Sequence, residues 1–124
     1  MTALAFLAPP PGFAPFVDFT LSDIDGAEGL YALEATQDAG IRLFVLDAAV
    51  YLPDYTPVIS DEQSAALGLA TAEDAAVLVV ANPSDEATTM NLMAPIVVNR
   101  ATGVSAQVIL EGQNWPLRAE LAAR

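Results

Sequence analysis

The sequence predicts a mainly β domain, in which a small antiparallel, barrel-like sheet is accompanied by one or two short helices. Short apolar runs recur between Gly, Pro, Asn and Asp residues, which is typical of strands separated by turns. Only short stretches carry the start and stop signals of a helix. The chain has 124 residues, which suits a single domain over 1–124, and neither a linker nor an internal repeat divides it.

Seven apolar runs are predicted to be strands, because they are short, several are rich in Val and Ile, and turn residues bound most of them. They are Val17–Leu21, Leu30–Ala35, Ile41–Leu46, Val77–Ala81, Met90–Met93, Ile96–Asn99 and Val104–Leu110. The runs Leu43–Leu46 and Val77–Val80 are continuously apolar, as in strands covered on both faces, and a closed or nearly closed barrel provides such cover. A short buried helix gives the same apolar run, so this alternative stays open.

The clearest helix candidate is Asp61–Gly68. Ser60 can cap this helix, and Gln63 stands where it completes a capping box. Acidic residues fill the first turn, where the helix dipole favours them, and Gly68 is a natural stop. A second short turn is expected from Thr71.

The clearest hairpin joins the last two predicted strands through the five residues Asn99–Gly103. A loop of this length that contains Asn and Gly is common in hairpins. Gly103 can adopt a positive φ there at little steric cost. Upstream, Ala94 and Pro95 are expected to shape an edge or a bulge, because proline cannot donate to a strand ladder.

The chain is strongly acidic. Sixteen Asp and Glu residues oppose four Arg, there is no Lys, and the net charge is −12. We therefore expect neither direct nucleic-acid binding nor attachment to an anionic membrane, because both depend on cations. A basic protein partner fits this charge, since complementary fields raise association rates by about 10 to 10³. Charge that serves only solubility is the alternative.

The chain lacks the side chains on which most enzyme sites depend. It has no Cys and no His, which excludes disulfides, thiolate metal ligands and the usual proton shuttle. Its acids form three adjacent pairs, Asp61–Glu62, Glu73–Asp74 and Asp85–Glu86. Neighbouring carboxylates point in different directions, so these pairs suit helix starts or solvated loops better than catalysis. We predict that the protein is not an enzyme and uses no cofactor.

Asp23–Gly26 looks like part of a calcium-binding loop. Aligned by its glycine, the loop would place Leu21 and Ala32 at ligand positions, and neither side chain can bind the ion. A polar turn is therefore expected here, and no metal site is predicted.

The N-terminal region does not fit a secretory signal. Ala3–Ala8 is apolar, but no basic residue precedes it and Pro9–Pro11 ends it. No window approaches the roughly 20 apolar residues of a membrane-spanning helix. We therefore expect a soluble, cytoplasmic protein.

Taken in order, the motifs resemble those of the FliW family of flagellar assembly factors. The most specific piece is Met90–Asn99, whose Asn-Leu-x-Ala-Pro-Ile core is close to a family signature. Further matching segments are Pro11–Phe13, Leu30–Glu34, Ile41–Asp47, Leu52–Tyr55, Ser60–Leu69, Gln107–Glu111 and Trp115–Arg118. Each is weakly specific alone, but their order and spacing over Pro11–Leu121 are specific together.

Three features depart from the family pattern. Only Ala3–Ala8 precedes the Pro-Gly-Phe turn, where family members have a full strand, so the N-terminal strand region is expected to be shortened. An aromatic residue is missing at Ala32, and Trp115 replaces the commoner tyrosine. A missing strand would leave a sheet edge that another strand, a partner or the C-terminal tail has to cover.

The resemblance implies a regulator that acts by binding proteins. FliW proteins antagonise the translational repressor CsrA, and they also bind flagellin. Free flagellin sequesters FliW, and once flagellin is exported, the released FliW removes CsrA from the flagellin message by an allosteric route. The acidic composition suits such a basic, RNA-binding partner.

Six residues are candidates for partner binding: Asp54, Tyr55, Asn91, Asn99, Glu111 and Trp115. Tyr55 and Asp54 lie at a predicted turn, where the alternative is that the tyrosine packs and the aspartate stabilises the turn. The alternative for both asparagines is to bond the backbone at strand ends. Trp115 is either an exposed interface anchor or a plug at one end of the barrel, and Glu111 is a charged candidate near it.

Two other functions compete with protein binding. A small barrel that binds an apolar ligand in its interior needs a large, closed cavity lined by apolar side chains. A carboxylate-only hydrolase needs two acids from separate segments that meet in a cleft. A filled core with an acidic, partly apolar outer patch favours protein binding.

Overall fold

The computed structural model describes residues 2–9, 13, 15–24, 26, 28–52, 55, 57–82, 88–110, 112–115 and 119–120. The strands are β1 Thr2–Phe6, β2 Asp18–Asp23, β3 Leu30–Ala35, β4 Asp38–Asp47, β5 Ala75–Asn82, β6 Thr89–Asn99, β7 Val104–Gln107 and β8 Ala119–Glu120. The helices are α1 Ala48–Tyr51, α2 Asp61–Leu67 and the short 3₁₀ turn η1 Ala72–Asp74.

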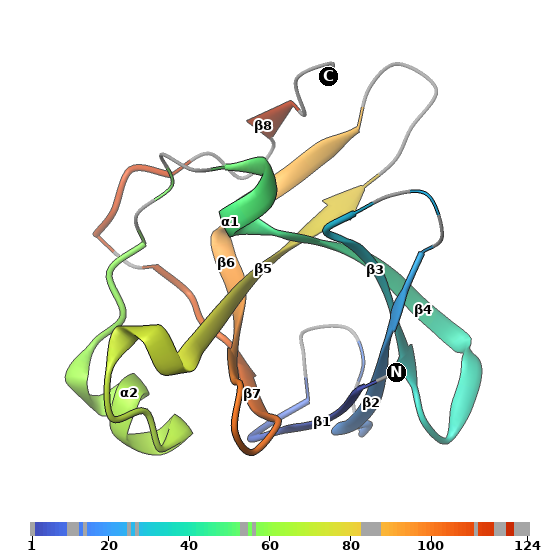
Figure 1. The fold of residues 1–124 in the computed structure, drawn as a ribbon, viewed down its shortest axis with the longest axis horizontal. Coiled ribbons are helices and arrows are strands. Elements are labelled where there is room, and N and C mark those ends of the chain that lie inside the picture. The colour runs from blue at the N-terminus through green and yellow to red at the C-terminus, as the bar shows by residue number, and fades with distance from the viewer. Residues whose placement is uncertain are drawn as a thin grey trace.

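Seven of the strands close into a barrel, seen down its axis in Figure 1. Their order is β5-β4-β3-β2-β1-β7-β6, and pairing of β5 with β6 completes the ring. All neighbours are antiparallel except β1 and β7, which run parallel through two residue pairs. The short strand β8 adds to β6 outside the ring. The predicted barrel-like, mainly β class with short helices is confirmed.

The N-terminal edge is paired. β1 pairs with β2 on one side and with β7 on the other. Gly103 permits this seam, because its φ is +81° and a Cβ there would lie 2.7 Å from the backbone oxygen of Ala3. The expected positive φ at Gly103 is confirmed, and its close approach to β1 adds a second reason for glycine.

The segments Met90–Met93 and Ile96–Asn99, predicted as two strands, form one strand, β6. Its pairing with β5 slips in the middle, because Leu78 faces Ile96 while Val80 already faces Asn91. A single residue of β5, Val79, therefore lies opposite four residues of β6, and those four form a bulge that includes Pro95. The predicted bulge is confirmed, and it bends the strand without ending it.

Other boundaries differ in smaller ways. The predicted strand Val104–Leu110 stops at Gln107, after which the chain leaves the ladder. Strand β4 is longer than expected, and α1 follows it directly, with the Asp47 side chain accepting a hydrogen bond from Ala49 N at 3.0 Å. β1, α1 and β8 were not predicted as elements.

Helix α2 begins and ends as predicted. Ser60 and Gln63 exchange the two bonds of a capping box, at 3.1 Å and 2.9 Å. Gly68 ends the helix in the left-handed conformation, with φ +72°. The expected second turn is η1, whose Asp74 carboxylate accepts bonds from the backbone of Ala70 and Thr71.

The barrel interior is filled by side chains that alternate along the strands. Phe19, Leu33, Val45 and Ile96 are completely buried there. Phe6 meets Phe19 edge to face, with 5.2 Å between ring centroids. Burial of this kind contributes about 25 cal/mol per Å² of apolar surface, so the filled interior stabilises the fold.

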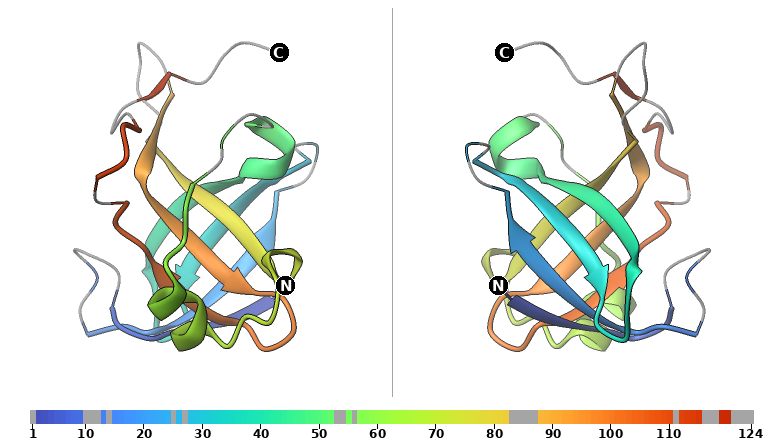
Figure 2. Two further views of the ribbon diagram at one scale, coloured as in Figure 1. Left: turned by 90° about the vertical axis from the view of Figure 1, so that its left-hand side faces the viewer. Right: turned by 90° about the vertical axis from the view of Figure 1, so that its right-hand side faces the viewer.

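A second apolar layer covers part of the outside. The described linker residues 55 and 57–60, helix α2, and residues 108–110 and 112–115 of the C-terminal segment lie over the outer faces of β5, β6 and β7 (Figure 2, left). Val79 and Val97, which point outward from the barrel, are therefore as buried as the interior residues. The predicted cover on both faces of the continuously apolar strands is confirmed at Leu46 and Val79, whereas Phe44 and Val77 are only partly buried.

Candidate functional site

The bulge of β6 organises the outer layer through its carbonyl groups. Four consecutive carbonyls, from Leu92 to Pro95, each accept a hydrogen bond from the linker or from the chain after β6. The pairs are Tyr55 Oη with Leu92 O, Leu110 N with Met93 O (2.8 Å), Gln107 Nε2 with Ala94 O (3.1 Å), and Val108 N with Pro95 O (2.9 Å). The signature segment therefore fixes both the linker and the C-terminal segment on the barrel wall.

Tyr55 lies at the centre of this arrangement. Its ring is half-buried and meets Trp115 edge to face, with 4.7 Å between ring centroids. Burial raises the pKa of the Tyr55 phenol to about 12, so the hydroxyl stays protonated and donates to Leu92 O at any physiological pH. This geometry matches the alternative that Tyr55 packs at the turn, and its role in partner binding stays a prediction.

Gln113 joins the linker to the C-terminal segment. Its side-chain amide accepts from Val58 N and donates to Val58 O, both at 3.0 Å. The same amide oxygen accepts from Trp115 Nε1 at 3.2 Å. We call Tyr55, Val58, Gln113 and Trp115 the clasp. Gln113 was not predicted, because nothing local in the sequence links it to a residue 55 positions earlier.

The six predicted site residues do not form one cluster. Tyr55 and Trp115 meet in the clasp, and Asn91 lies at the start of the bulge, where its side chain accepts from Met93 N at 3.1 Å. Trp115 packs on the outer face of the barrel, so it does not plug an end. Asp54 and Glu111 lie outside the described residues.

Asn99 lies apart from the others and is only 5% exposed. Its amide nitrogen donates to Leu67 O at 2.9 Å, and its amide oxygen accepts from Ala101 N at 2.9 Å. The side chain thus holds the end of α2 against the β6–β7 turn. We propose a structural role for Asn99, which was the alternative open to it.

Two hollows adjoin each other on the outer face of β5 and share four lining residues. The first, of about 360 Å³, lies beside α1, and the second, of about 690 Å³, lies beside α2. Both are lined by Tyr55, Pro57, Ala75 and Val77. We call the combined feature the β5 groove. One side of it is the linker that the clasp holds in place.

The barrel mouth offers little to an apolar ligand. It contains a half-open hollow of about 480 Å³, lined by apolar residues such as Leu21 and Leu78 and by charged residues such as Asp23, Asp47 and Arg100. Burial, and then the nearby carboxylates, raise the pKa of Tyr31 on the same rim. The hollow is half-open and of mixed polarity, whereas the interior-ligand function needs a closed apolar cavity.

Two carboxylates of the barrel-mouth hollow are relevant to the hydrolase alternative. Asp23 and Asp47 come from separate strands and line one hollow, which is the arrangement that a two-carboxylate mechanism requires. The Asp47 side chain, however, is engaged in capping α1. Within the described part of the chain, no group of three or more acidic residues is arranged to hold a metal ion.

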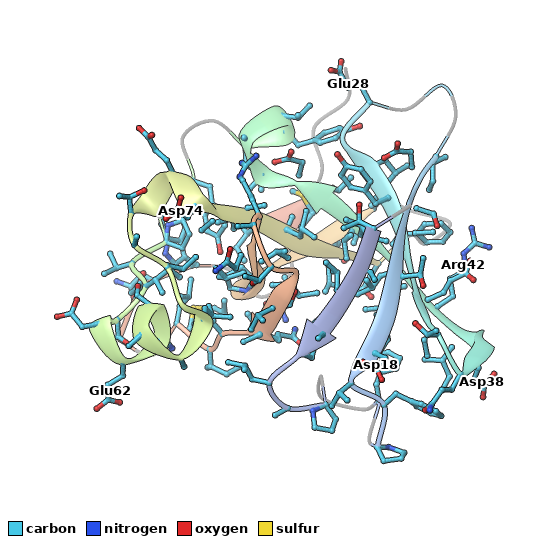
Figure 3. All side chains as sticks on the ribbon, turned by 60° about the horizontal axis from the view of Figure 1, so that its bottom comes forward. Asp18, Glu28, Asp38, Arg42, Glu62 and Asp74 are labelled. Atoms are coloured by element: carbon cyan, nitrogen blue, oxygen red, sulfur yellow. The ribbon has the colours of Figure 1, made fainter. Side chains whose placement is uncertain are left out.

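The surface charge is spread around the molecule. Figure 3 shows Glu28, Asp38 and Glu62 pointing away from the barrel in different directions. Arg42 lies beside Glu34, with 3.6 Å between Nε and Oε1, and over the ring of Phe44. Arg100 donates from Nε to Ala75 O at 3.4 Å.

The helices that the structure describes are short, and none is long and apolar enough to cross a membrane.

Comparisons with known proteins agree with one another. The family model described as FliW protein matches residues 1–121. The flagellar assembly factor FliW of Desulfitobacterium hafniense (strain Y51) is 30% identical over 113 residues, which is 90% of this chain and 74% of that protein. FliW of Leptospira biflexa is 28% identical over 113 residues, covering 89% of this chain and 74% of its own length.

A solved structure is similar throughout. A crystal structure of the flagellar assembly factor FliW superimposes with a TM-score of 0.90 and 25% identity, covering 98% of this chain and 86% of that one. On the sequence, the family match and the fold, this chain belongs to the FliW family of flagellar assembly factors.

Proposed function

We propose that this protein antagonises CsrA and binds flagellin, and thereby couples flagellin synthesis to flagellum assembly. The observation that carries the proposal is the family match over residues 1–121, together with relatives that are named flagellar assembly factors. These names describe an assembly factor rather than an enzyme. The finer assignment to CsrA and flagellin comes from the family resemblance.

The physical character of the chain supports the proposal. A net charge of −12 favours encounter with a basic protein, such as one that binds RNA. The outer layer offers a surface of mixed chemistry, because the ring of Tyr55 and the exposed Asp61 of α2 line the same hollow. Aromatic residues that are half-buried at a surface are frequent anchors in protein interfaces.

The mechanism follows from competition between two partners. Flagellin that has not been exported occupies the protein and keeps it from CsrA. After export, the free protein binds CsrA, lowers its affinity for the flagellin message and so permits translation. The coupling is reciprocal in free energy, since whichever partner weakens the binding of the other is weakened by it to the same degree.

The test is calorimetric titration of the purified protein with CsrA at moderate salt, repeated in the presence of flagellin. Binding at about micromolar affinity or tighter, relieved by flagellin, is the expected result. Binding to flagellin alone would leave a chaperone-like role and remove the regulatory one. Binding to neither partner would overturn the proposal.

A further inference from the structure

We propose that the β5 groove binds a segment of the basic partner, in which a bulky apolar side chain is flanked by Lys or Arg. This inference rests on the proposed function, because it names where on the protein that partner binds. It commits to CsrA rather than flagellin as the protein that supplies the segment.

The floor of the groove is apolar and accessible. Val77 and Ala75 point outward from β5 and are only partly buried, although Val79, two residues further on, is fully covered. The outer layer therefore has a gap over the start of β5. Leu69 and Ile59 add apolar walls to the larger hollow. A hollow of about 690 Å³ lies within the usual range of about 300–1,000 Å³ for binding pockets.

The charge of the α2 side selects a cationic occupant. The segment from Asp61 to Asp74 contains four acids and no basic residue. Asp61 lines the groove, is exposed, and has no ion-pair partner among the described residues. The α1 end of the groove is lined by one cation, Arg100, and one acid, Asp47, so their charges offset each other there. An incoming Lys or Arg is thus attracted to the α2 end, which fixes the direction of the bound segment.

The groove is held open before binding. Pro57 belongs to its wall. The side-chain amide of Gln113 holds the adjacent Val58 through two hydrogen bonds to the Val58 backbone. Tyr55, shared by both hollows, is fixed by its bond to Leu92 O. A preformed wall spares the cost of ordering the linker during association, so more of the contact energy appears as affinity.

The chain supplies a matched pair of variants for the test. Ala65 and Ala66 are neighbouring, exposed residues of α2, and Ala65 lines the groove whereas Ala66 lines a different hollow on the β7 side. A65R places a long cationic side chain in the groove, while A66R adds the same charge and the same side chain to the same helix outside it. Arginine favours a helix, so both variants should keep α2 intact.

We expect A65R to weaken CsrA binding at least about tenfold and A66R to change it by less than about twofold. Flagellin binding should persist in both variants and confirms that they are folded. If A65R binds CsrA as the wild type does, or if A66R loses binding equally, the groove is not the site although the proposed function stands. Selective loss of flagellin binding in A65R overturns the choice of partner. Failure of the wild type to bind either protein removes the proposed function and this inference together.

A second pair isolates the charge. D61N and E62Q each remove one acid from the first turn of α2, but only Asp61 lines the groove. We expect D61N to weaken CsrA binding about threefold and E62Q to have a smaller effect. The difference should vanish between about 0.05 M and about 0.5 M salt, because exposed charges are screened. Equal effects of the two variants would contradict the directed charge.

Discussion

The two sides of the barrel wall differ in what lies outside them. On β5, β6 and β7, outward-pointing residues such as Ala81 and Val97 are buried beneath the linker, α2 and the C-terminal segment. On β1, the outward-pointing Ala3 and Ala5 are exposed, and Thr20 of β2 is only partly covered. The first side is therefore a double layer, while the second is a single wall that closes the ring.

The difference shows where interaction surfaces arise in a small barrel. A single wall presents its outward-pointing residues directly to water, so it has no second layer in which a groove can form. A covered wall gains a layer whose shape is set by loops and by a helix, and its gaps become grooves. We therefore expect substitutions at covered positions to cost more than matched substitutions at exposed positions.

The largest contrast comes from placing the same charge on each wall. A81K buries an ammonium group on the outer face of β5, where the residue is 6% exposed, and should lower the free energy of unfolding by about 3–5 kcal/mol. A5K places it on the exposed face of β1 and should cost less than about 0.5 kcal/mol. Urea unfolding of both variants measures the contrast, and similar losses would contradict a second layer.

Loss of the tyrosine hydroxyl should have the next largest effect. Y55F leaves Leu92 O without its donor and should lower the free energy of unfolding by about 1–2 kcal/mol. Tyr51 is the control, because its hydroxyl donates to Glu28 O at an exposed site and Y51F should cost about 0.5 kcal/mol. An equal cost for both variants would mean that the clasp adds nothing to an ordinary surface bond.

Alkaline pH should weaken the same contact. Because burial raises the pKa of Tyr55 from 10.0 to about 12, the folded state holds this proton more tightly than the unfolded state. The resulting stability is fully present below pH 10 and is lost as pH rises through about 12. We expect the difference in urea midpoint between wild type and Y55F to shrink over this range. The change should be about 1 kcal/mol, since the half-buried ring is partly screened by solvent.

Removal of the amide that joins the linker to the C-terminal segment should cost about 1 kcal/mol. Q113A loses both bonds to Val58 and the bond from Trp115 Nε1. N114A truncates the adjacent, exposed amide and should be close to neutral. Tryptophan emission should shift to longer wavelength in Q113A alone, because Trp115 becomes more accessible to water. An unshifted spectrum would show that the clasp does not depend on Gln113.

The smallest effect is expected at the surface ion pair. Arg42 and Glu34 face each other across β3 and β4, but both side chains are at least one-third exposed. A double-mutant cycle of R42A and E34A should give a coupling energy of about 0.5 kcal/mol or less. A coupling above about 1 kcal/mol would indicate that β3 and β4 hold these two side chains in a fixed geometry.

Much of the barrel could be predicted from local sequence. Continuous apolar runs such as Val77–Val80 indicated cover on both faces, and Pro95 indicated a bulge, because both signals are local. Helix α2 was predictable for the same reason, since its cap, dipole and stop residues are contiguous. Fusion of two predicted strands into β6 was missed, because a bulge and a break look alike in a single sequence.

The site was less predictable because its contacts are distant in sequence. Tyr55 was singled out, yet its partner Leu92 lies 37 residues away, and no periodicity connects them. Gln113 has an ordinary local context and acquires its role only when the linker reaches it. The short elements α1 and β8 depend on tertiary packing rather than propensity, which is weak in segments of four and two residues.

The seam between β1 and β7 has a consequence for how the chain acquires its fold. Ala5 pairs with Val104, and the two strands share only two residue pairs. During synthesis, β1 and β2 emerge long before β7 exists, so the outer edge of β1 stays unpaired until nearly the whole domain has left the ribosome. Contacts this distant in sequence form slowly. The ring is therefore expected to close last at the seam between β1 and β7. Because β1 has only five residues, the edge that stays unpaired until then is short.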